Sequence, residues 1–255
     1  MPLLALLLIA CQVICGLHVV RSGQERYWIY LIIALPGLGC LIYALGIMLP
    51  DMLRSRRGRR AVNQLHDRFD PERHLRVLRN DLDISDTRET RVLLADELLR
   101  LNQAEEAASH YQAALRGIHA HAPEIMLGLA RAHFAHGDAS ACRLTLEQLR
   151  EHNPDFRSAD GHLLYAQTLT QLGDVLKAEE EYRALLGYFA GPEAPLHYAL
   201  LLKQLGRNRE ARELLEQIDS YARRAPKHYR NLHQACLAQA RSELQELSKA
   251  LDQPA

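Results

Sequence analysis

Histidine, a side chain that can bind a metal or move a proton, occurs 13 times in this sequence. Four of them fall close together: His119 and His121 in an expected loop, and His133 and His136 in the helix expected after it. A zinc site needs three or four ligands that converge on one point. His133 falls at a packing position and the first pair lies in a loop insertion, so we predict no metal site and no cofactor.

The other reactive residue types are also arranged without a catalytic pattern. Five cysteines occur, and no two have the Cys-x-x-Cys spacing: Cys11, Cys15, Cys40, Cys142 and Cys236. The last two are far apart, which predicts free thiols rather than a disulfide framework. The sequence has no Gly-x-Ser-x-Gly motif and no phosphate-binding glycine loop. These observations predict a protein that is not an enzyme.

Charge divides the chain into two parts. The 255 residues carry 31 Lys and Arg against 31 Asp and Glu, so the net charge is zero and a general nucleic-acid binder is not expected. Only three charged residues fall within residues 2–50, and the other 59 fall within residues 51–255. The two parts therefore require different surroundings.

The first part has the composition of a membrane hairpin. Residues 2–20 and 27–50 contain no charge, and the first of these stretches is about 28 Å long as a helix. We predict two transmembrane spans at 2–20 and 27–50, the second interrupted by Pro36, Gly37 and Gly39. A cleaved signal peptide is disfavoured because no basic residue precedes Arg21. Small residues four apart, such as Cys11 and Cys15, indicate close packing within the hairpin or, alternatively, dimerisation.

A basic cluster follows the second stretch and predicts the topology. It consists of Arg54, Arg56, Arg57, Arg59 and Arg60, against two arginines in the turn between the stretches. The positive-inside rule places this flank in the cytoplasm, where it can also contact anionic lipid. The chain has 27 Arg and four Lys, which hints at a GC-rich bacterial genome. We expect a bacterial inner-membrane protein with residues 61–255 in the cytoplasm.

The second stretch, from Trp28 through Pro36-Gly37-Leu38-Gly39 to Tyr43, resembles the N-terminal membrane segment of phospholipase D-type cardiolipin synthases. The resemblance implies an anchor only. That family's chemistry needs His-x-Lys, and none of the four lysines has a histidine two residues before it. It leaves one alternative function, a regulatory subunit of a membrane enzyme of phospholipid or envelope metabolism.

The second part is an internal repeat. Four turn positions are spaced by 35, 36 and 33 residues, at Asn102, Gly137, Gly173 and Gly206. Small residues stand five positions after each turn, at Ala107, Cys142, Ala178 and Ala211, and seven before it, at Ala95, Ala130, Ala166 and Ala199. Large residues directly precede these four alanines, at Leu94, Leu129, Tyr165 and Tyr198. Large residues also stand nine positions after each turn, at Tyr111, Leu146, Tyr182 and Leu215.

This pattern resembles the tetratricopeptide repeat, a helix–turn–helix unit of about 34 residues. The resemblance implies an all-α fold with four repeats over 89–226, preceded by a basic linker and helix over 51–88. Residues 71–83 are expected to be helical, and residues 227–255 are expected to form a capping helix and tail. The tryptophan common in this family is replaced by Arg91, Met126, His162 and Pro195.

The resemblance also implies a concave surface that binds protein partners. The residues expected on it are Asp96, Arg100, Arg131, Phe134, Gln167, Thr170, Gln171, Lys203 and Gln204. Their mixed charge favours an extended or helical peptide over a polyanion. Phe134 is either an aromatic anchor for the partner or a residue packed inside the array. We predict a membrane-anchored adaptor or scaffold, for which homo-oligomerisation stays open.

Overall fold

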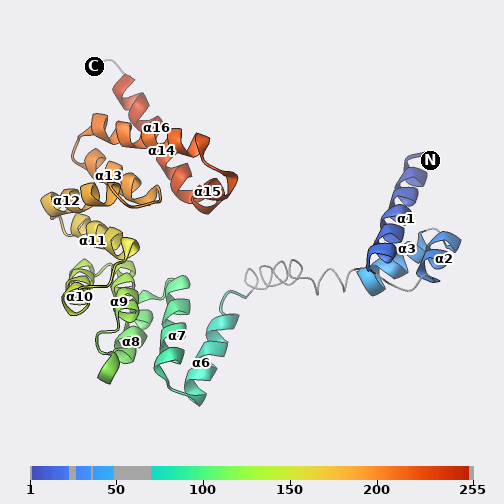
Figure 1. The fold of residues 1–255 in the computed structure, drawn as a ribbon, viewed down its shortest axis with the longest axis horizontal. Coiled ribbons are helices and arrows are strands. Elements are labelled where there is room, and N and C mark those ends of the chain that lie inside the picture. The colour runs from blue at the N-terminus through green and yellow to red at the C-terminus, as the bar shows by residue number, and fades with distance from the viewer. Residues whose placement is uncertain (1, 23–26, 36, 49–69, 253–255) are drawn as a thin grey trace. The chain divides into compact units, whose positions relative to one another are not determined.

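The computed structural model describes residues 2–22, 27–35, 37–48 and 70–252 (Figure 1). These residues form two compact units, Met1–Arg73 and His74–Ala255. The basic cluster Arg54–Arg60 lies outside the described residues. Each unit is considered by itself below.

The first unit is a small cluster of helices. It contains α1 (Pro2–Ser22), α2 (Tyr27–Ala34), α3 (Leu38–Tyr43) and a π-helical turn at Ala44–Met48. Cys15, Val19, Ile32, Cys40 and Tyr43 form its buried centre.

The polar side chains of α1 bond within this cluster. Gln12 donates a hydrogen bond to the Ile32 carbonyl at 3.0 Å, which has lost its usual helical partner because Pro36 has no N–H. His18 is hydrogen-bonded to the Tyr43 hydroxyl at 3.0 Å. Both side chains therefore tie α1 to the segments that follow it.

The second apolar stretch is broken where its glycines predicted an interruption. Helix α2 ends at Ala34, and α3 begins after Gly37, which has a φ of 91°. A Cβ atom at Gly39 would lie 2.5 Å from the Leu31 carbonyl oxygen, so this close approach requires glycine. Within the residues that the structure describes, no helix is both long and apolar enough to cross a membrane, and the two expected spans are not confirmed.

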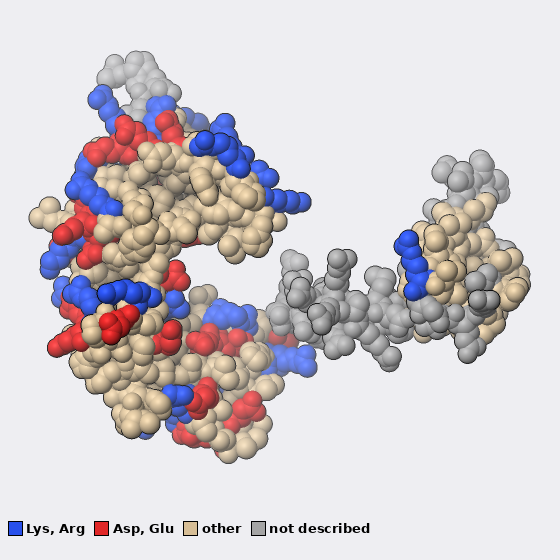
Figure 2. Space-filling view, in the orientation of Figure 1, with Lys and Arg blue, Asp and Glu red and all other residues tan. Residues whose placement is uncertain are grey.

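The second unit is a curved stack of antiparallel helices. Helix α6 (Arg73–Ile84) precedes four helix pairs, and α15 (Lys227–Leu232) and α16 (Gln234–Asp252) follow them. The pairs are α7 (Arg88–Arg100) with α8 (Ala104–Ala114), α9 (Pro123–His136) with α10 (Ala139–His152), α11 (Ala159–Gln171) with α12 (Val175–Leu186), and α13 (Glu193–Gln204) with α14 (Asn208–Arg224). Figure 1 shows α9 and α11 on the inner side of the arc and α10 and α12 on its outer side. Acidic and basic side chains are interspersed over its visible face (Figure 2).

The four predicted turn residues all adopt the left-handed conformation. Their φ angles are 60°, 89°, 74° and 75° at Asn102, Gly137, Gly173 and Gly206. In each turn the following residue donates its N–H to a carbonyl five residues back, as Asp138 does to His133 at 2.9 Å. The turn residue itself donates to a carbonyl three back, as Gly137 does to Phe134 at 3.0 Å. All four turns are therefore complete Schellman motifs, which satisfy the last carbonyls of one helix and start the next.

The small residues of the repeat lie where the two helices of each pair cross. All eight are at most 1% exposed: Ala95, Ala107, Ala130, Cys142, Ala166, Ala178, Ala199 and Ala211. The buried residues around them form three successive clusters, over α6–α9, over α9–α11 and over α11–α16. The apolar core thus extends along the stack as three adjoining clusters.

The C-terminal cap differs from the single helix that the sequence predicted. The chain turns at His233, whose ring binds the Glu193 carboxylate at 2.6 Å, and this separates α15 from α16. Leu232, before the turn, is 69% exposed, and Leu237, after it, is buried. Helix α16 packs on α14 through Leu237, Ala240 and Leu247. The break therefore removes Leu232 from the apolar face of the cap, and Cys236, Ala240, Leu244 and Leu247 keep their contact with the core.

Candidate protein-binding site

The residues predicted for the concave surface are largely engaged in contacts within the protein. Asp96 accepts a hydrogen bond from the Tyr111 hydroxyl, and Arg100 pairs with Glu97 at 2.6 Å. Thr170 donates to the Ala166 carbonyl at 3.0 Å. These side chains support their own repeats.

Lys203 lies at the end of the surface that the cap covers. Its ammonium group is 2.6 Å from Glu243 and 3.0 Å from Glu246, both on α16. These carboxylates raise the Lys203 pKa, with Glu243 contributing most. A partner's carboxylate would have to displace them to bind Lys203.

Phe134 and Arg131 lie in different environments although both are on α9. Phe134 is half-buried against the central core cluster, which favours the packing alternative over an anchor. Arg131 is exposed and lies 3.7 Å from Asp160 on the next repeat. Gln171 and Gln204 are exposed, and Gln167 is half-buried. The exposed members of the predicted set are therefore Asp96, Arg100, Arg131, Gln171 and Gln204.

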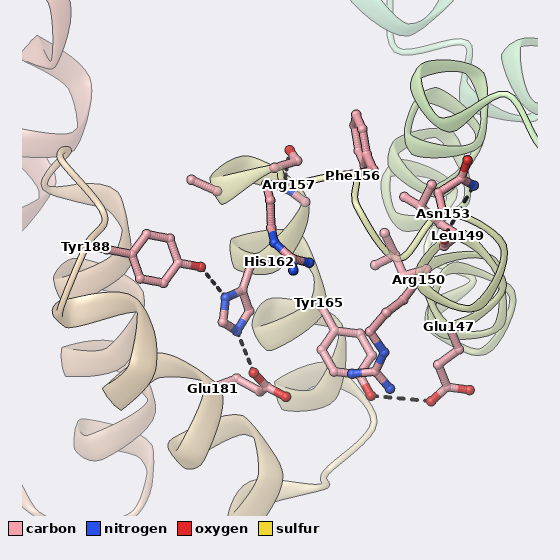
Figure 3. Close-up of a pocket in the computed structure, with 14 residues that line it drawn as sticks. Glu147, Leu149, Arg150, Asn153, Phe156, Arg157, His162, Tyr165, Glu181 and Tyr188 are labelled. Atoms are coloured by element: carbon pink, nitrogen blue, oxygen red, sulfur yellow. Dashed lines mark hydrogen bonds and ion pairs between the residues drawn. The ribbon is translucent and has the colours of Figure 1, made fainter.

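A cleft of ≈ 450 Å³ lies at another place, between α10 and α12 with α11 as its floor. Figure 3 shows Tyr165 and His162 on the floor, Tyr188 on one side, and Leu149 and Asn153 on the other. None of the nine predicted residues lines it. Its apolar lining comes from Leu146, Leu149, Phe156, Tyr165 and Tyr188.

The sequence contained one indication of this cleft. Aromatic residues gather around the third repeat at Phe156, Tyr165 and Tyr188, where the first two repeats have Leu94 and Leu129 at the position of Tyr165. The loop between α10 and α11 contributes Phe156, Arg157 and Ser158 to the lining of the cleft. Loop conformation was not encoded in the repeat pattern, so the cleft was not predicted.

His162 orders one wall of the cleft. Its Nε2 atom lies 2.5 Å from a Glu181 carboxylate oxygen, and its Nδ1 atom is hydrogen-bonded to the Tyr188 hydroxyl. An ionised carboxylate only accepts, so Nε2 carries a proton and donates it to Glu181. Burial and then the Glu181 charge raise the Tyr188 pKa, so that hydroxyl stays protonated at neutral pH.

The cleft has two carboxylates and two arginines, and among the residues that the structure describes only the carboxylates have charged or hydrogen-bonding side-chain partners. Glu181 is occupied by His162, and Glu147 accepts from the Tyr165 hydroxyl at 3.3 Å and lies 3.9 Å from Arg143. The Arg150 guanidinium lies over the Tyr165 ring at 5.9 Å, and Arg157 donates to the Pro154 carbonyl at 2.8 Å. Within the described part of the chain neither of these two arginines has an ion-pair partner.

Three thiols also converge, in the first unit. The sulfur atoms of Cys11, Cys15 and Cys40 all lie within 4.8 Å of one another, although no sequence spacing predicted this. Sulfurs that share a metal with bonds of about 2.3 Å lie roughly 4 Å apart, so a small contraction would let the trio hold a soft cation. Helix packing brings Cys40 to the pair on α1.

Comparison with known proteins supports the interpretation of the second unit. Residues 98–167 match the tetratricopeptide repeat family model. Comparison with curated proteins gives no match. The resemblance of the N-terminal stretch to phospholipase D-type synthases finds no support in these comparisons.

Two solved structures are similar to this chain at low sequence identity. A thermophilic tetratricopeptide repeat protein from Thermus thermophilus has 22% identity and a TM-score of 0.51, over 70% of this chain and 96% of its own. The protein MamA has 16% identity and a TM-score of 0.46, over 69% of this chain and 89% of its own. Residues 98–167 are therefore identified as tetratricopeptide repeats, and the second unit as a whole has the fold of a helical solenoid.

Proposed function

We propose that this protein is an adaptor or scaffold that binds protein partners through its solenoid. The observation that carries the proposal is the stack of four helix pairs, each closed by the same turn and by buried small residues. Such a stack presents two long faces to its surroundings, and repeat arrays use these extended faces for binding.

We further propose that the first unit anchors the protein in a bacterial inner membrane, with the solenoid in the cytoplasm. Apolar side chains on α1 are more than half exposed at Ile9, Val13, Ile14, Leu17 and Val20. The visible face of this unit has few charged side chains (Figure 2). Exposed apolar surface of this extent is costly in water, and lipid would cover it. The arginines at 54–60 support the orientation.

Crosslinking in cells followed by purification of the full-length protein in detergent tests the adaptor role. A chain that keeps residues 1–88 and lacks the repeats serves as the control. A partner enriched on the full chain and absent from the control is expected. If the two chains capture the same proteins in the same amounts, the adaptor role is wrong.

Membrane anchoring has its own test. The full-length protein should stay in the membrane pellet after alkaline carbonate extraction, and a reporter fused after Ala255 should behave as cytoplasmic. Release into the carbonate supernatant would exclude an integral anchor. Periplasmic activity of the fusion would reverse the proposed orientation.

A further inference from the structure

We infer that the cleft between α10 and α12 is a docking site for an acidic segment of a partner protein, one with a large apolar side chain beside its carboxylates. The inference rests on the proposed adaptor function and assigns a second binding face to it. Helices α10 and α12 lie on the outer side of the arc, away from the face predicted from the sequence (Figure 1).

The apolar part of the segment is defined by the lining of the cleft. Leu146 and Leu149 belong to the buried core and provide a fixed wall, whereas Tyr188 is 55% exposed. A partner side chain that entered here would cover the exposed tyrosine surface without displacing the core. Interfaces gain most of their energy from aromatic and large apolar groups placed in such pockets.

We infer the acidic character of the segment from the pairing of the charged side chains in the cleft. The two carboxylates of the cleft, Glu147 and Glu181, already have partners, whereas Arg150 and Arg157 have no carboxylate partner among the described residues. Figure 3 shows the Arg157 guanidinium turned toward His162, on the floor of the cleft. Carboxylates on the partner could form ion pairs with these two arginines. The same arginines would repel a basic segment. The chain's own arginine-rich residues 54–60 are therefore an unsuitable occupant.

A peptide fits this arrangement better than a small anion. Both arginines are exposed, so a lone anion would bind each of them weakly in a high dielectric. The volume of ≈ 450 Å³ accepts one or two side chains of a longer segment. In such a complex the apolar side chain contributes most of the affinity, and the arginines fix the register of the carboxylates.

Selection from a random 12-residue peptide library displayed on phage, against the full-length protein in detergent micelles, provides the probe. Selected peptides are then measured by fluorescence anisotropy on the wild type and on Arg150→Glu and Arg157→Glu. We expect peptides with Asp or Glu next to Phe, Tyr, Trp or Leu. Each reversal should weaken their binding about tenfold or more.

Arg209→Glu is the matched control. Arg209 is exposed on α14, does not line the cleft, and is changed by the same charge. It should leave the affinity of the selected peptides within about twofold of the wild type, since rim charges act mainly over short range at physiological salt. Arg150→Gln and Arg157→Gln remove the charge without reversing it. Weaker peptide binding by these variants, at unchanged helicity and melting, shows loss of the contact and not of the fold.

Several results would overturn the inference. One is a set of selected peptides that bind Arg150→Glu and Arg157→Glu as well as the wild type. Another is displacement of the peptides by inorganic phosphate alone, which would show a simple anion site. A third is an Arg150→Glu, Arg157→Glu double variant that still captures its crosslinked partner in cells. That last result would leave the adaptor role intact, whereas loss of all specific capture by the wild type would refute the role itself.

Discussion

At the scale of single residues, the sequence was most informative where backbone geometry or space allows few residue types. The turn residues and the small residues at helix crossings were predicted from spacing, and the structure gives each the expected φ angle or burial. The contacts of Lys203 and Phe134 could not be predicted in this way. Lys203 binds a carboxylate 40 residues further along the chain, and such pairing depends on how the repeats stack.

Asn102 tests the requirement for a left-handed turn residue. It is the single non-glycine residue with positive φ in the described ranges. Asn102→Gly should keep or slightly raise the free energy of unfolding, whereas Asn102→Ala should lower it by about 1 kcal/mol, because alanine pays the steric cost of this conformation. Urea denaturation followed by far-UV circular dichroism measures both. Equal stability of the two variants would contradict the assigned turn.

Ala166 tests the helix crossing within the third repeat. It is 0% exposed, so Ala166→Leu should lower the free energy of unfolding by about 1–3 kcal/mol through overpacking. Gln171→Leu on the same helix is the control, because Gln171 is exposed and should tolerate the change. A thermal melt should also broaden for Ala166→Leu, since the repeats are coupled only to their neighbours. Unchanged melting would mean that the crossing lies elsewhere.

At the scale of helices, the sequence predicted the number and order of the repeat helices but not the form of the cap. Residues 227–251 have a continuous helical periodicity, and nothing in that pattern marks the turn at His233. The deciding contact is the bond from His233 to Glu193, which lies in another repeat. The outer cleft also escaped prediction, because residues of the loop between α10 and α11 line it and the repeat pattern does not specify that loop.

Asp219 links the cap to the last repeat and predicts a pH dependence. It is only 8% exposed, and its carboxylate lies 2.8 Å from Arg241 on α16 and 2.7 Å from Arg223. Arg241 and Arg223 hold the Asp219 pKa below its ordinary value of 3.8. A lowered pKa means that the stabilisation is complete above pH 3.8 and is lost as the pH falls through the lower value of the folded protein.

The prediction compares the wild type with Asp219→Asn. The wild type should be the more stable protein at pH 7, and its advantage should shrink as the pH falls below about 4. Hydrogen exchange of the α16 amides measures the docking of the cap directly. Glu216→Gln on α14 is a control, because Glu216 is exposed and pairs with Arg212 of its own helix. An advantage that persists undiminished at low pH would contradict this account.

At the scale of the whole molecule, the charge distribution predicted two parts that divide at residues 50 and 51, whereas the two compact units of the structure divide at residues 73 and 74. The core of the second unit is formed within that unit. Residues 61–255 carry 24 basic and 29 acidic residues, which favours solubility.

The expected result is that residues 61–255 express as a soluble helical protein without detergent. Their thermal midpoint should match that of the solenoid in the full-length protein, because the three core clusters of the repeats consist of residues of the second unit. Size-exclusion chromatography and calorimetry measure this. Aggregation of the fragment would show that the solenoid needs the first unit.

The placement of the outer cleft between two neighbouring repeats has a mechanical consequence. The cleft adjoins the junction between the central core cluster and the C-terminal one, where α11 contributes residues to both. A segment bound between α10 and α12 would change the angle between the two repeats that these helices belong to. A small change of angle at this junction becomes a displacement of several ångströms at the distant ends, because each later repeat carries the rotation onward. A partner bound in the outer cleft would then set the curvature of the concave surface. It would thereby control the width of the groove available to a second partner on that surface.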